Sequence, residues 1–116
     1  PENTIYIANE YAHNQCPYNA ILTHEFKHVD VDLRVVKKYL PYLKTAISQR
    51  AAEVALIKDL PVADLDKIKE KVEKHLMQAL NAIEAYMTNE RQQLQQQVDS
   101  AEEYNRISTL IHNCPK

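Results

Sequence analysis

The chain contains no glycine in its 116 residues. Glycine is the residue that most readily adopts the positive φ angles of tight turns, so β-hairpins should be scarce. Alanine, leucine, glutamine, glutamate and lysine, which favour helices, are common instead. A chain of this length suits one domain and can bury a core without a metal. The sequence therefore predicts a single, mainly α domain over residues 1–116, built from long helices.

A first long helix is predicted to start near Pro17, because proline is favourable in the first helical turn. Apolar residues then recur at alternating steps of four and three, which is a heptad seam. The seam keeps its phase through Pro41, so we expect one helix over 17–58 that is kinked at this proline. A helical hairpin that bends at Pro41 is the alternative. The seam consists of Leu22, Phe26, Val29, Leu33, Val36, Leu40, Leu43 and Ile47.

A break is predicted at 58–64, where Pro61 interrupts the chain and Asp64 can cap the next helix. That helix should run over 64–98, with its glutamine-rich stretch forming a solvated face. Two helices of similar length joined by a short loop predict a long antiparallel hairpin. The apolar face of the second helix consists of Ile68, Val72, Leu76, Leu80, Ile83, Met87, Leu94 and Val98.

The two ends of the chain are predicted to differ. Ser100 and Glu103 fit the S-x-x-E capping box, so a short C-terminal helix is expected over 100–113. Residues 1–15 are not helix-like and should form an extended arm. Within the arm, the β-branched and aromatic residues 4–8 favour either a short strand or an extended segment.

The segment His24-Glu25-Phe26-Lys27-His28 contains the pattern H-E-x-x-H. Residues four apart lie on one face of a helix, so both imidazoles can bind a single Zn²⁺. Glu25 lies about 100° round the helix and can reach water at the metal without being a ligand. Glu25 is therefore the candidate general base and, later, general acid. Both histidines fall on the side of the helix away from the heptad seam. We expect the seam to lie against a backing helix, and either the arm or the C-terminal helix to cover the histidines.

A zinc site needs a third protein ligand. If the hairpin turns near residue 61, His24 lies level with about residue 98, and Asp99 is then the nearest carboxylate. If the chain folds back at Pro41, Glu53 is the alternative ligand. Tyr104 is either a phenol that stabilises an oxyanion or a core tyrosine. The remaining histidines have no partner at ligand spacing, and these are His13, His75 and His112.

Charge and cysteine content limit the partners and the compartment. The net charge of −2 gives no electrostatic basis for nucleic-acid binding, and no apolar run approaches a membrane span. Cys16 and Cys114 lie near opposite ends and are predicted to form a disulfide, with two free thiols as the alternative. The chain begins with Pro1 rather than Met, so we expect a fragment or a processed form without its signal peptide.

Residues 6–8, 16–29 and 97–104, together with Cys114, resemble a group of small exported bacterial proteins described as predicted zinc-dependent peptidases of the zincin type. Lys27 and Asp30 stand where zincins prefer an uncharged and a hydrophobic residue. The resemblance implies a periplasmic or secreted protein with His24 and His28 as zinc ligands and Glu25 as base. In zincins an edge strand beside the metal helix pairs with substrate, and residues 4–8 would be its counterpart.

The first hypothesis is a zinc metallopeptidase that acts on a peptide or a cell-envelope amide bond. The second is a non-catalytic helical module for structure or interaction, which an exposed heptad seam would favour because such a surface seeks a partner. The partner can be a second copy of the chain, which would give a homo-oligomer formed through the helices. The third is a degenerate zincin that binds zinc without turnover.

Overall fold

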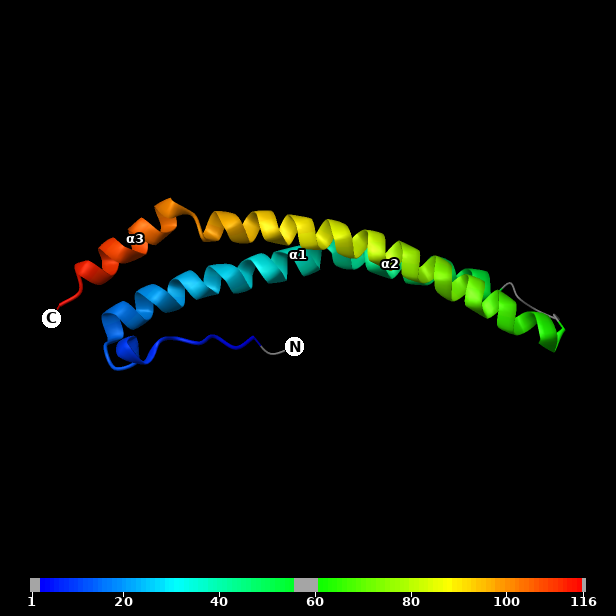
Figure 1. The fold of residues 1–116 in the computed structure, drawn as a ribbon, viewed down its shortest axis with the longest axis horizontal. Coiled ribbons are helices and arrows are strands. Elements are labelled where there is room, and N and C mark those ends of the chain that lie inside the picture. The colour runs from blue at the N-terminus through cyan, green and yellow to red at the C-terminus, as the bar shows by residue number, and fades with distance from the viewer. Residues whose placement is uncertain (1–2, 56–60, 116) are drawn as a thin grey trace. The chain divides into compact units, whose positions relative to one another are not determined.

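The computed structural model describes residues 3–55 and 61–115, and these residues are mainly helical (Figure 1). A short 3-10 helix, η1 (Asn9–Tyr11), precedes three α-helices: α1 (Gln15–Ala55), α2 (Val62–Val98) and α3 (Ala101–His112). No strand occurs among the described residues, so residues 3–8 form an arm and not a strand. The predicted extended arm over 1–15 is wrong for its second half, because η1 lies within it and α1 begins at Gln15. The predicted end of the first helix at residue 58 lies outside the described residues.

The two long helices pack as the predicted antiparallel hairpin. Contacts divide the chain into two compact units, one of residues 1–34 and 90–116 and the other of residues 35–89. Each unit contains a segment of α1 and a segment of α2, so the predicted single domain stays a prediction. Within the second unit, α1 continues through Pro41, which excludes a hairpin at this proline. The kink at Pro41 stays a prediction.

The helix starts follow from local capping. The Asn14 side chain accepts a hydrogen bond from the Cys16 N–H, so α1 begins two residues before the predicted Pro17. The predicted N-cap at Asp64 is wrong, because the Pro61 carbonyl accepts the N–H groups of Asp64 and Leu65 and places both inside the first turn of α2. In this first turn, the negative Asp64 carboxylate still interacts favourably with the positive end of the helix dipole.

The predicted apolar face of α2 is confirmed, because all eight of its residues are half-buried. The predicted packing of the α1 seam is wrong for five of its eight residues, which are exposed, while Leu22, Val29 and Leu43 are half-buried. In the first unit, Phe26 and Leu33 are 55% and 58% exposed, whereas Val31 is buried. In the second unit, Val36 and other seam residues are exposed, whereas Val35 is buried. The helix α1 carries two apolar stripes, and the packed stripe is the one that also contains His24.

The chain ends are tied together in the first unit. Cys16 at the start of α1 and Cys114 after α3 form the predicted disulfide, which closes a 98-residue separation. Ser100 caps α3 as predicted, because its hydroxyl accepts a hydrogen bond from the Glu103 N–H at 3.2 Å. Among the described residues, no helix has the length and hydropathy needed to cross a bilayer.

Candidate metal centre

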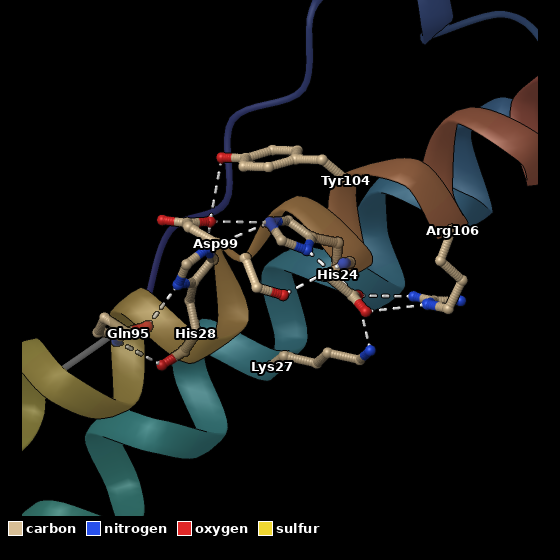
Figure 2. A network of polar contacts seen from close by, with 9 residues as sticks. His24, Lys27, His28, Gln95, Asp99, Tyr104 and Arg106 are labelled. Carbon is tan, nitrogen blue, oxygen red and sulfur yellow. Dashed lines mark hydrogen bonds and ion pairs between the residues drawn. The ribbon is translucent and has the colours of Figure 1, made fainter.

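Three side chains converge in the first unit, two from α1 and one from the junction of α2 and α3 (Figure 2). The Nε2 atoms of His24 and His28 lie 3.2 Å apart. Asp99 Oδ1 lies 3.2 Å from His24 Nε2 and 2.9 Å from His28 Nε2. His24 is 5% exposed, while His28 is half-buried and Asp99 is exposed, so the group opens to solvent on the Asp99 side.

The position of Asp99 follows from the end of α2. This helix ends at Val98, and Ser100 begins the cap of α3, so Asp99 lies at the turn between them. The structure therefore brings together the two motif histidines and the carboxylate predicted from a hairpin near residue 61. Glu53, the alternative ligand, lies in the second unit and forms an ion pair with Arg50.

The Nδ1 atom of His24 faces a carboxylate. Glu103 Oε1 lies 3.4 Å from this nitrogen and also accepts hydrogen bonds from Lys27 Nζ at 2.6 Å and from Arg106 Nη2 at 2.7 Å. The hydrogen bonds from Arg106 and Lys27 hold the pKa of Glu103 far below its ordinary value, although burial by itself would raise this pKa. The carboxylate is therefore ionised and acts only as an acceptor.

The Nδ1 atom of His28 faces a neutral amide. Gln95 Oε1 accepts a hydrogen bond from His28 Nδ1, and Gln95 Nε2 donates to the His28 carbonyl at 3.1 Å and to Asp32 Oδ1 at 2.9 Å. Arg91 Nε donates to the same Asp32 oxygen at 2.6 Å. Burial tends to raise the pKa of Asp32, but the hydrogen bonds from Arg91 and Gln95 outweigh it and the pKa is lowered. The prediction of a solvated glutamine face is thus wrong for Gln95.

Tyr104 lies beside the group, on α3. Its hydroxyl donates a hydrogen bond to Asp99 Oδ1 at 3.2 Å, and its ring centroid is 5.7 Å from that of His24. The hydrogen bond to Asp99 raises the pKa of Tyr104, so the phenol keeps its proton and remains a donor. The side chain is half exposed, so Tyr104 is not the core tyrosine of the alternative interpretation.

Glu25 lies where two clefts meet. A cleft of about 510 Å³ lies between the arm and the α1–α2 surface, and its lining includes Thr4, Glu25 and Arg91. A second cleft of about 370 Å³ is lined by Ile21, Ile107 and also Glu25. His28 and Asp99 line both clefts as well. Among the described residues, the half-buried Glu25 carboxylate has no hydrogen bond or ion pair, so it remains available to water or a substrate.

Sequence reasoning missed the roles of Glu103 and Gln95 in contacting the two Nδ1 atoms. Glu103 is expected close to the site from the residue count, but the capping box pattern assigns it a structural role. In the structure its side chain does not return to Ser100, and only its backbone N–H takes part in the cap. One signal was present in the sequence, because Glu103 and Arg106 are spaced as an i, i+3 pair on one helix.

The comparisons add no relative. Neither models of known protein families, nor curated proteins, nor solved structures give a match to this chain. The resemblance to zincins therefore stays a prediction, and the function has to be argued from the site itself.

Proposed function

We propose that this protein is a zinc-dependent hydrolase of peptide or cell-envelope amide bonds, with His24, His28 and Asp99 as the zinc ligands. The geometry of three atoms carries the proposal. Ligands held at roughly 2.0–2.1 Å from a tetrahedral zinc ion lie about 3.3–3.4 Å from one another. The three corresponding separations here are 3.2, 3.2 and 2.9 Å.

The hydrogen bonds of the histidines support the same assignment. Each Nδ1 faces an oxygen acceptor, so each ring can carry its proton there and keep a lone pair on Nε2. Two such lone pairs and a carboxylate oxygen repel one another unless a proton or a metal cation lies between them. The donor set of two imidazoles and one carboxylate, with an open side, is typical of catalytic zinc.

The reaction would use residues that surround the ligands. When bound, zinc would act as a Lewis acid that polarises the scissile carbonyl and lowers the pKa of water. Glu25 would remove the proton from the attacking water and then pass it to the leaving amine. Tyr104 would turn its phenol from Asp99 toward the developing oxyanion. An extended substrate would reach Glu25 from both clefts, because this carboxylate lines each of them.

An exported location belongs to the same proposal. The disulfide between Cys16 and Cys114 supports a periplasmic or secreted protein, because disulfides persist in oxidising compartments.

Metal content tests the ligand assignment. Protein purified without a histidine tag should carry one equivalent of zinc by elemental analysis, and His24→Ala or His28→Ala should abolish it. His75→Ala is the matched control, because His75 is exposed on α2 in the second unit, and it should keep the full equivalent. Zinc retained by both motif variants would refute the proposed site.

A Glu25→Gln variant separates catalysis from metal binding alone. It should keep zinc, because Glu25 is not a ligand, and lose turnover of a peptide library by about 10²–10⁴-fold, the usual contribution of a general base. Equal hydrolysis by the variant and the wild type would remove Glu25 from the mechanism. If neither hydrolyses any amide while both keep zinc, the protein is the zinc-binding protein without turnover.

A second candidate function is a helical interaction module, and the exposed α1 seam favours it. In the second unit this seam exposes Val36, Leu40 and Ile47, which are large apolar side chains. If copies associate through this surface, sedimentation should show an oligomer that Leu40→Gln dissociates. Met77→Gln is the control, because Met77 is also a large, exposed apolar residue but lies on α2. A monomer at every concentration would exclude the homo-oligomer.

A further inference from the structure

We propose that Glu103 is a positioning residue that fixes the ring of His24 with Nε2 directed at the metal, and that Lys27 acts through Glu103 to the same end. The inference rests on the proposed zinc site and assigns α3 a part in building it. Lys27 is one of the two charged residues that depart from the zincin pattern, and its contact with Glu103 gives it this role.

The Glu103 carboxylate is held from two helices. Lys27 of α1 reaches Oε1 at 2.6 Å, and Arg106 of α3 reaches Oε1 at 2.7 Å and Oε2 at 2.9 Å (Figure 2). The Glu103 side chain is 12% exposed, whereas its partners Lys27 and Arg106 are 43% and 42% exposed, so solvent screens these charge-assisted bonds in part. Three such bonds leave the carboxylate little rotational freedom.

The held carboxylate selects the tautomer of His24. Glu103 Oε1 is 3.4 Å from His24 Nδ1, and the ring is almost fully buried. Asp99 Oδ1 lies 3.2 Å from the other nitrogen, Nε2, so carboxylates face both sides of this ring. An ionised carboxylate can only accept, so once a metal ion takes the place of a proton between Nε2 and Asp99, the ring keeps its proton on Nδ1, toward Glu103. The Nε2 lone pair of His24 then points toward His28 and Asp99. A carboxylate in this position also makes the imidazole a stronger metal ligand.

The helix cap leaves Glu103 free for this role. Its backbone N–H is bonded to the Ser100 hydroxyl, which fixes the first turn of α3, while its side chain projects toward α1. The two ligand histidines therefore have unequal partners. His24 has a charged acceptor from α3, whereas His28 has a neutral amide from α2. Loss of Glu103 should accordingly affect His24 and leave His28 unchanged.

The test compares Glu103→Gln with Glu102→Gln. Both variants remove one negative charge from the first turn of α3, but Glu102 is exposed and has no partner among the described residues. Zinc affinity is measured by competition with a chromophoric chelator. Glu103→Gln should weaken zinc binding by about 10–100-fold, the usual effect of losing such a partner, and Glu102→Gln should not change it.

A second readout does not depend on zinc. Long-range ¹⁵N–¹H correlation spectra of the metal-free, disulfide-bonded protein report which nitrogen of each histidine carries the proton. Because Asp99 accepts at Nε2 of the same ring, the measure is the change between proteins. The proton occupancy of His24 Nδ1 should be equal in the wild type and in Glu102→Gln, and lower in Glu103→Gln. His28 should be unchanged in all three proteins. Lys27→Met should change His24 in the same direction as Glu103→Gln, but to a smaller extent.

The outcomes separate the two proposals. A wild type that takes up no zinc would refute the proposed function, while the tautomer of His24 would still decide the role of Glu103. A wild type that binds zinc, with Glu103→Gln binding it equally well and His24 unchanged, would overturn the inference and leave the zinc site intact. Helical content measured by circular dichroism identifies any variant that fails to fold.

Discussion

At the residue scale, the site depends on both nitrogens of each histidine. The Nε2 atoms approach Asp99, and the Nδ1 atoms face Glu103 and Gln95. A histidine held only at one end could rotate away from a metal, whereas a ring bonded through its other nitrogen is preorganised. The contacts around the H-E-x-x-H motif are thus as informative about its chemistry as the motif itself.

The ionisation of Glu103 predicts a pH-dependent stability. Its folded-state pKa is lowered below the ordinary 4.5, so its contribution is complete above about pH 4.5 and declines as the pH falls toward the folded-state value. Urea unfolding with a chelator present should therefore show a large difference between wild type and Glu103→Gln at pH 7 and a smaller one at pH 3. An equal difference at both pH values would contradict this ionisation.

Sequence reasoning named the candidate ligand residues that the structure brings together and missed their partners, for a physical reason. His24, Glu25 and His28 follow from the spacing of one helix, and Asp99 follows from counting residues across a hairpin. The contacts of Glu103 and Gln95 instead depend on how side chains turn between α1, α2 and α3. Spacing along one helix contains no information on that choice.

At the element scale, the two long helices differed in how well their packing could be predicted. The helix α2 has one apolar face, and that face is the packed one. The helix α1 has two, and the regular heptad that includes Phe26 and Leu33 is exposed. The less regular stripe packs because it also contains His28 and Asp32, which bond to Gln95 and Arg91 of α2. Periodicity measures apolar spacing and does not identify which stripe has a partner.

The cap of α3 gives a prediction at this scale. Ser100→Ala removes the acceptor of the Glu103 N–H and should lower the free energy of unfolding by about 1 kcal/mol. Ser108→Ala is the control, because Ser108 lies exposed inside the same helix, where alanine is the better helix former. Chemical unfolding of the wild type and the two variants measures the three free energies of unfolding. An equal decrease in both variants would rule out a specific cap.

At the scale of the whole molecule, one covalent link joins residues far apart in the sequence. The disulfide ties the start of α1 to the residues after α3, and both of these segments belong to the unit that contains the candidate metal centre. Ligands from α1 and from the α2–α3 junction can converge only if these segments stay together.

Removing the link should therefore cost stability. A Cys16→Ser/Cys114→Ser variant should have a free energy of unfolding about 2–4 kcal/mol lower than that of the wild type. The chain-entropy model gives an upper value of ~4.7 kcal/mol for a loop of about 100 residues. A reductant should lower the unfolding free energy of the wild type and leave that of the double variant unchanged. Equal stability of the oxidised wild type and the double variant would show that the disulfide does not constrain the chain.

The central claim is that two imidazoles one helical turn apart and the Asp99 carboxylate bind one zinc ion. Crystals soaked with zinc and measured at the zinc absorption edge test it most directly. The account predicts a single strong anomalous peak within about 2.0–2.2 Å of both Nε2 atoms and of an Asp99 oxygen. A map with no peak between these atoms, or rings that point apart into solvent, would contradict it.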